Sequence, residues 1–141
     1  MYMKQIFVFL ENTIGRLTDF TGALEKHQVD IKAMYVAETT DFGILRVLVT
    51  DPEKTKEILS ESGFNAVITD VLAVEVDNVA GSLHKILEKL TSQNIAVEYI
   101  YSALQLKKDK AILIFKVKEG EKAITLLEKA GVKMLVTEDL V

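Results

Sequence analysis

Two short stretches of the chain repeat one pattern of residue types that could bind a small anion. Residues 12–17 and 78–83 both read Asn-x-x-Gly-x-Leu, and an apolar run precedes each of them. A glycine at the start of a helix lets a ligand approach the backbone closely, because glycine has no Cβ. The first amide groups of a helix have no acceptor within the helix and lie at the positive end of its dipole, so they suit a carboxylate. Each stretch is therefore either a cradle for a small anion or an ordinary turn in which asparagine caps a helix.

These two stretches belong to a longer internal repeat. Residues that match between the two copies lie within the expected helices and strands. The offset, which is the difference in residue number between aligned positions, changes only in the expected loops, and loops tolerate changes of length. We place the boundary near Thr69-Asp70, which predicts two domains, 1–69 and 70–141. The aligned segments are 11–24 with 77–90 at an offset of 66, 30–35 with 94–99 at 64 (which pairs Tyr35 with Tyr99), and 49–64 with 117–132 at 68.

Each copy has the element order βαββαβ. β-branched and aromatic runs predict the strands, and apolar residues spaced three and four apart predict the helices. The order predicts an α+β fold of two tandem ferredoxin-like units, each an antiparallel sheet with two helices on one face. The predicted strands are 4–11, 29–39, 44–50 and 65–70, then 71–76, 95–104, 110–117 and 132–137; a hairpin turn is expected at 39–43, and helices at 15–27, 51–62, 80–92 and 120–130.

The whole chain resembles ACT domains, small regulatory modules that bind amino acids, in two tandem copies. The family's loop reads strand-x-Asn-x-Pro-Gly-x-Leu, which residues 10–17 (LENTIGRL) and 76–83 (VDNVAGSL) match in part. The family's second signature is Asn/Asp-Ile at the start of the second strand, which residues 29–31 (VDI) and 93–95 (QNI) match. The resemblance implies that loop amides bind an α-carboxylate, while Asp30 or Asn94 accepts hydrogen bonds from an α-ammonium group.

The chain departs from the family pattern at three places. Asp30 replaces asparagine in the first copy while Asn94 keeps it in the second, so the two sites can differ in ligand or competence. Ile14 and Ala80 stand where the family has proline, so both turns are less rigid. Leu10 and Val76 stand where the serine-sensing branch has histidine, which argues against specific serine sensing. The candidate ligand-binding residues are those of the two loops and of the second signature: Asn12, Thr13, Ile14, Gly15, Arg16, Leu17, Asp30, Asn78, Val79, Ala80, Gly81, Ser82, Leu83, Asn94 and Ile95.

Composition excludes several kinds of partner. The chain has 141 residues, a net charge of −4 and no cysteine, so neither nucleic acid nor an anionic membrane is expected to bind it. The absence of cysteine and the short N-terminal apolar run favour a cytoplasmic protein. No metal or cofactor is expected, because His27 and His84 have no partners at the spacing of metal ligands.

No residue pattern supports catalysis, so the chain is expected not to be an enzyme. Acylphosphatase shares the element order but needs an arginine-bearing, glycine-rich loop after its first strand, and Arg16 alone is a poor match. RNA-recognition domains share the order too, but they need exposed aromatic residues on the central strands.

Several predicted strands are apolar on both faces, although helices can cover only one face. Either the other repeat or a second chain is expected to cover the free face, which favours a homodimer. The favoured function is a free-standing sensor with a small amino acid bound at the loops, near an interdomain or intersubunit seam. The alternative is a regulatory subunit of an amino-acid biosynthetic enzyme, like the small subunit of acetolactate synthase.

Overall fold

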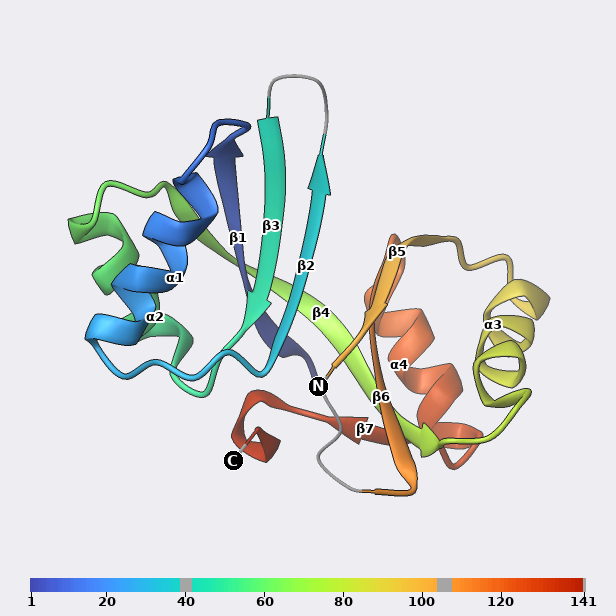
Figure 1. Cartoon of the computed structure of the whole chain (residues 1–141). Coiled ribbons are helices and arrows are strands. Elements are labelled where there is room, and N and C mark those ends of the chain that lie inside the picture. Colours follow the sequence, from blue (N-terminus) through green and yellow to red (C-terminus); the bar gives the residue numbers. More distant parts are fainter. Residues whose placement is uncertain (39–41, 104–107, 141) are drawn as a thin grey trace. The chain divides into compact units, whose positions relative to one another are not determined.

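A computed structural model describes residues 1–38, 42–103 and 108–140 (Figure 1). The expected hairpin turn at 39–43 lies largely outside these residues. The helices and strands of the described residues follow one another in the order expected of two ferredoxin-like units. The elements are β1 (Met3–Glu11), α1 (Arg16–Lys26), β2 (Ala33–Glu38), β3 (Phe42–Leu48), α2 (Pro52–Glu61), β4 (Ala66–Asp77), α3 (Ser82–Ser92), β5 (Val97–Ser102), β6 (Lys110–Val117), α4 (Gly120–Lys129), β7 (Lys133–Leu135) and the 3-10 helix η1 (Thr137–Asp139).

The chain divides into two compact units. The N-terminal unit comprises Lys4–Thr69 with Leu140, and the C-terminal unit comprises Asp70–Asp139 with Met1–Met3. The sequence predicted separate strands on the two sides of the boundary, but β4 is one continuous strand of 12 residues. No glycine or proline interrupts β4, and its apolar and β-branched residues let the strand continue through Asp70.

In the N-terminal unit, an antiparallel sheet in the order β2-β3-β1-β4 carries α1 and α2 on one face. Alternate residues of β1 face the helices, as the period of a strand requires. Ile6 and Val8 pack in this way against Phe20 and Leu24 of α1 and Leu59 of α2, and all five side chains are buried.

In the C-terminal unit, the antiparallel sheet has the order β7-β4-β6-β5, again with two helices on one face. Leu72 and Val74 of β4 pack against Ile86 and Leu90 of α3 and Leu127 of α4. Both units therefore have the ferredoxin-like α+β fold predicted from the sequence.

Strand pairing gives the true correspondence between the two copies. Tyr35 faces Arg46 across β2 and β3, and the equivalent position across β5 and β6 is Tyr101 facing Ile114. The offset is therefore 66 in the second strand as well as in the first, and it becomes 68 only in the third strand. The predicted match of Tyr35 with Tyr99 is wrong by two residues, because two tyrosines alternate along β5 and either one can be aligned.

The second helix of each unit begins differently. Asp51 caps α2, since its Oδ1 accepts a hydrogen bond from the Lys54 amide at 3.2 Å, and Pro52 is the first helical residue. Glu119 occupies the same position before α4, but its side chain makes no capping hydrogen bond. Of these two helices, only α2 therefore has a side-chain cap at this position.

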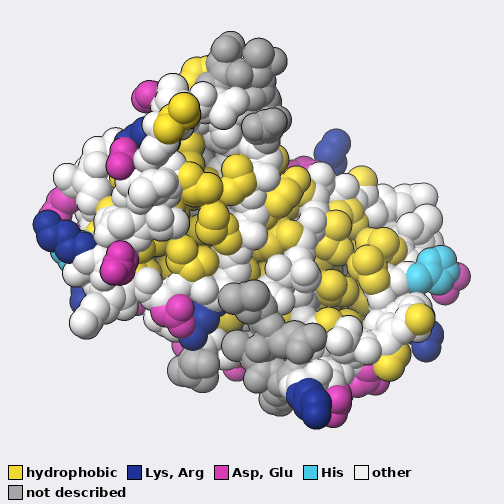
Figure 2. All heavy atoms as spheres, viewed as in Figure 1, with side chains coloured by type: hydrophobic (Ala, Val, Ile, Leu, Met, Phe, Trp, Pro, Cys, Tyr) yellow, Lys and Arg dark blue, Asp and Glu magenta, His cyan; other side chains and the backbone are white. Residues whose placement is uncertain are grey.

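The helix-free face of the N-terminal sheet is apolar and open. Hydrophobic side chains gather over β1, β3 and β2 in Figure 2. Phe9 is 54% exposed, Phe42 is 52% exposed and Val67 is 46% exposed. The Arg46 guanidinium lies 5.5 Å from the centroid of the Phe7 ring on the same face. Exposed apolar side chains on neighbouring strands form a surface suited to a protein partner.

Candidate functional site

Both candidate loops enter their helix through a glycine in the left-handed conformation. Gly15 has φ 91° and Gly81 has φ 92°, each with ψ −12°. A Cβ at either position would meet open space, so the backbone conformation alone requires glycine. These glycines are themselves the N-cap residues, without a side-chain capping bond. The N-cap position of each helix is therefore the glycine and not Asn12 or Asn78.

The two loops present uncovered apolar side chains beside free backbone donors. Ile14 is fully exposed, and Val79 is 67% exposed. Leu17 and Leu83 are each 41% exposed, at matching positions in the first helical turns. The Arg16 and Ser82 amides donate to the Thr13 and Val79 carbonyl oxygens, each at 3.3 Å. The next amides of the first turns, those of Leu17 and Leu83, have no acceptor four residues earlier in the helix and can donate to a ligand carboxylate. The loops thus combine anion donors with an apolar surround.

The loop of the N-terminal unit is held by an arginine. The Arg16 guanidinium lies 4.2 Å from the centroid of the Phe64 ring, and its Nη1 lies 3.9 Å from Asp19. Phe64 in turn packs edge-on against Phe20, with the ring centroids 5.6 Å apart. This stack orients Arg16, one of the candidate ligand-binding residues, against the core.

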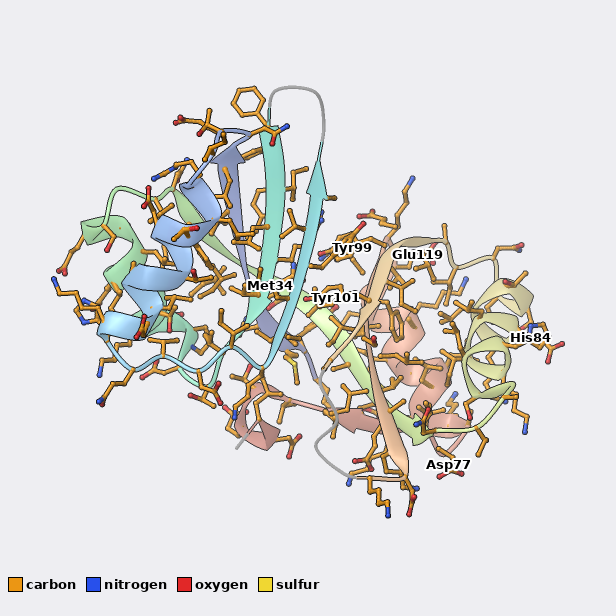
Figure 3. The ribbon with its side chains drawn as sticks, viewed as in Figure 1. Met34, Asp77, His84, Tyr99, Tyr101 and Glu119 are labelled. Carbon is orange, nitrogen blue, oxygen red and sulfur yellow. The ribbon has the colours of Figure 1, made fainter. Side chains whose placement is uncertain are left out.

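The loop of the C-terminal unit borders a hollow of about 370 Å³, which we call the α3 hollow. The Asn78 amide donates to the Asp109 carbonyl oxygen at 2.9 Å, which ties this loop to the start of β6. Asp77 (labelled in Figure 3) pairs with Lys110. The α3 hollow is lined by Glu75, Val76, Asp77, Ser82, Lys85, Ile86, Lys89, Lys110, Gly131, Val132 and Lys133.

The neighbouring lysines lower the pKa of Asp77 in this hollow. Its hydrogen bond with Lys110 lowers the pKa of Asp77, and the charge of Lys85 lowers it further. Asp77 therefore stays ionised in mildly acidic solution and can accept hydrogen bonds from a cation.

The residues of the second signature lie at the other end of each helix. α1 has 11 residues and so separates Gly15 from Asp30 by about 16 Å. Asp30 accepts a hydrogen bond from Lys32 at 2.8 Å, and Ile95 is only 4% exposed, within the core. A single unit does not bring its loop and its second signature together.

Asp30 and Asn94 are not equivalent residues. Asn94 has φ 57° and its amide donates to Thr91, and the matching residue in the first copy is Gln28, with φ 56° and a bond to Glu25. At the offset of 66, the counterpart of Asp30 is an alanine. Only the second copy therefore has an asparagine at the left-handed residue after its first helix.

His84 and the tyrosines of β5 form no site with the loops. His84 points outward from α3 (Figure 3), with a side chain that is 77% exposed and 3.8 Å from Glu88. Tyr99 and Tyr101 lie side by side on β5 with stacked rings 6.5 Å apart. Within residues 1–38, 42–103 and 108–140, no group of three or more His, Asp or Glu side chains could hold a metal ion.

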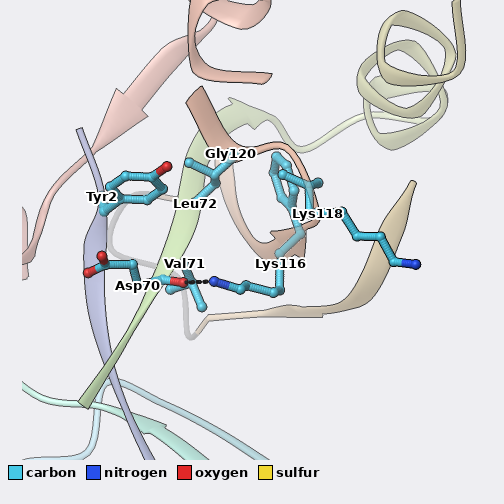
Figure 4. A pocket seen from close by; sticks show the side chains of 9 residues that line it. Tyr2, Asp70, Val71, Leu72, Lys116, Lys118 and Gly120 are labelled. Carbon is cyan, nitrogen blue, oxygen red and sulfur yellow. Dashed lines mark hydrogen bonds between the residues drawn. The ribbon is translucent and has the colours of Figure 1, made fainter. Parts of the chain in front are cut away.

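A second, smaller cavity of about 160 Å³ lies in the C-terminal unit (Figure 4). Lys116 donates to the Asp70 carbonyl oxygen at 2.9 Å along one wall. The Tyr2 hydroxyl lies against Gly120, where any Cβ would collide with it. Burial, and then a hydrogen bond with Glu121, raises the pKa of Tyr2. Tyr2 forms one wall of this cavity, and no residue of the loops 12–17 and 78–83 lines it.

No helix in the described part of the chain has the length and apolar character needed to cross a bilayer.

Two βαββαβ units in tandem, each with a left-handed glycine between its first strand and first helix, define a tandem ferredoxin-like protein. The chain belongs to the ACT domain pair family, whose model matches residues 1–141. No curated protein matches the sequence significantly.

Solved structures include one similar in sequence and several similar only in fold. The protein BT0572 from Bacteroides thetaiotaomicron is 37% identical, with a TM-score of 0.92 over 99% of this chain and 96% of that one. The ligand-free regulatory subunit of aspartate kinase from Thermus thermophilus is 16% identical, with a TM-score of 0.64 over 90% of this chain and 91% of that one. A structure of aspartokinase alpha and beta subunits is 20% identical, with a TM-score of 0.58 over 90% of each chain.

Proposed function

We propose that this protein is a non-catalytic sensor that binds a small amino acid at the loops 12–17 and 78–83. The carrying observation is the matched pair of left-handed glycines before α1 and α3, beside the first-turn amides of Leu17 and Leu83 and a surface with exposed apolar side chains. The amides would bind the α-carboxylate, and apolar loop residues would contact the ligand side chain. Membership of the ACT domain pair family, whose domains are regulatory modules, supports this proposal.

A second copy of the chain would complete the site. α1 is about 16 Å long and separates Gly15 from Asp30, so a loop and the second signature could meet only if different copies supply them. The open apolar face that includes Phe9, Phe42 and Val67 favours such an assembly. We therefore propose a homodimer. A cytoplasmic location stays a prediction from composition.

A thermal-shift screen of the full chain against the twenty amino acids tests the sensor function. A ligand at 100 times its dissociation constant should stabilise the fold by about 2.7 kcal/mol. An amino alcohol with the same side chain as the best ligand is the control, because it lacks the α-carboxylate. We expect the amino acid to raise the melting temperature and the alcohol to have no effect. No shift with any amino acid would contradict the proposal.

A second candidate is a regulatory subunit of an amino-acid biosynthetic enzyme. Solved structures with this fold include the regulatory subunit of aspartate kinase, which is one specific reason to consider an enzyme partner. Affinity purification of the tagged chain from its own cells separates the two functions. Stoichiometric recovery of one biosynthetic enzyme would favour the subunit, and recovery of the chain alone would favour the free sensor.

A further inference from the structure

The α3 hollow has an unbalanced positive charge. Two of its lysines are neutralised, since Lys110 pairs with Asp77 and Lys133 lies 3.2 Å from Glu75. Lys85 and Lys89 line the same hollow and form no ion pair with any residue in the described part of the chain. They are four residues apart on α3 and so lie on one face of the helix. The hollow therefore offers a ligand two ammonium groups that form no ion pair within the described part of the chain.

The hollow lies next to the second candidate loop. Ser82 is both a loop residue and the first residue of α3, and it lines the hollow together with Asp77. Lys85 is one helical turn further on, and Lys89 is two turns further. A ligand with its α-carboxylate at the first turn of α3 would therefore point its side chain towards both lysines. Val76, Ile86 and Val132 supply apolar walls for the methylene groups between the two charges.

The same surface of the N-terminal unit has the opposite character. At the offsets given by strand pairing, Asp19 replaces Lys85 and Ala23 replaces Lys89. Phe42 and Asn65 replace Lys110 and Lys133. The basic residue there is Arg16, whose guanidinium lies near Asp19 and on the Phe64 ring. The first loop therefore lacks the uncompensated charge of the second.

We propose that the second loop and the α3 hollow form a site for an acidic amino acid, whose side-chain carboxylate binds Lys85 and Lys89. This rests on the sensor function proposed above and adds the class of ligand and the copy that binds it. The Leu83 amide in the first turn of α3 and the Ser82 hydroxyl bind the α-carboxylate, and Asp77 accepts from the α-ammonium group. Each charge of the ligand thus meets an opposite charge or a donor, which is the arrangement that charge-assisted hydrogen bonds require.

Isothermal titration of the full chain tests this site, with glutamate, aspartate and their neutral amides glutamine and asparagine as probes. Each amide matches its acid in size and differs in charge, so the ratio of the two affinities isolates the contribution of the side-chain carboxylate. We expect one of the acids to bind about tenfold more tightly than its amide, which is the effect of one charge-assisted hydrogen bond. Lys85→Gln with Lys89→Gln should abolish that ratio.

The matched control removes two other exposed lysines. Lys56→Gln with Lys129→Gln makes the same change of net charge on α2 and α4, and it should keep the tenfold preference. Persistence of the preference in the Lys85/Lys89 variant, or its loss in the control, would overturn the acidic site. Binding of a neutral amino acid with no preference for an acid would overturn this inference alone. Failure of every amino acid to bind would overturn the sensor function as well.

Discussion

The two loops have one backbone geometry and different surroundings. Gly15 and Gly81 agree in φ to within a degree, and each is the N-cap of an 11-residue helix. Beside the first loop, Arg16 is stacked on Phe64 and the neighbouring charges balance. Beside the second loop, a serine replaces the arginine, and a hollow of about 370 Å³ with excess positive charge begins.

This difference teaches that the loop backbone and the ligand chemistry are separable. A left-handed glycine and free helix amides are needed wherever a carboxylate is to be bound by backbone donors. The side chains one and two turns along the helix then determine which ligand is favoured. Two copies of one fold can therefore share the backbone feature while only one copy has charges that select an acidic ligand.

Removing the aromatic support of the first loop should have the largest effect on stability. Phe64 is 5% exposed and contacts both Phe20 and Arg16. Phe64→Ala leaves a cavity and should lower the free energy of unfolding by about 3–5 kcal/mol in a urea titration. Val132 is the counterpart in the second copy, and Val132→Ala should cost only about 1–2 kcal/mol. Equal losses would show that the two loops are supported alike.

The two glycines should be equally sensitive to substitution. Gly15→Ala and Gly81→Ala each place a side chain in the left-handed region and should cost about 1–2 kcal/mol by thermal unfolding. Gly22→Ala is the control, because Gly22 lies within α1 with open space at its Cβ, and it should stabilise the chain by about 0.5–1 kcal/mol. A neutral result at either loop would contradict the shared backbone geometry.

Removal of the residue at the N-cap of α2 or α4 should change the free energy of unfolding by a smaller amount, and the change should differ between the two copies. Asp51→Ala removes the hydrogen bond to the Lys54 amide and should cost about 1 kcal/mol. Glu119→Ala at the matching position should change stability by less than about 0.5 kcal/mol, because Glu119 makes no capping bond. A large loss on Glu119→Ala would indicate that α4 is capped as α2 is.

The smallest effect is on the titration of one carboxylate. Lys110 lowers the pKa of Asp77, so this pair favours folding above the ordinary pKa of aspartate and loses that effect as the pH falls through the lowered pKa. Lys110→Gln should raise the pKa of Asp77 towards its ordinary value in a carbon-detected NMR titration. An unchanged pKa of Asp77 in this variant would show that Lys110 does not cause the lowered value. Lys122→Gln on α4, which pairs with Glu119, is the control.

Most of the fold follows from patterns in the sequence. The apolar run of residues 6–10 lies in the strand predicted at 4–11, and α2 lies in the helix predicted at 51–62, so both predictions are confirmed. The alignment of β5 with β2 could not be predicted from the sequence, because Tyr99 and Tyr101 are both tyrosines that can be matched to Tyr35. Only the pairing of β5 with β6 decides between them.

The candidate site was predicted in part. The glycine turns were found because two copies repeat them at one spacing. The α3 hollow was missed, since its lysines come from α3, β6 and β7 and meet only in the folded unit. The spacing of Lys85 and Lys89 was the available signal, but it needs the strand residues beside it to suggest a site.

The central claim is that these loops bind an amino acid, and amide chemical-shift mapping tests it most directly. Spectra of the nitrogen-15-labelled chain should be recorded while the amino acid with the largest thermal shift is added. We predict the largest shifts at the amides of residues 78–85, with smaller changes at 12–19. A bound amino acid that instead shifts the amides around Tyr2 and Gly120, or neither region, would contradict the assignment of the site to the glycine loops.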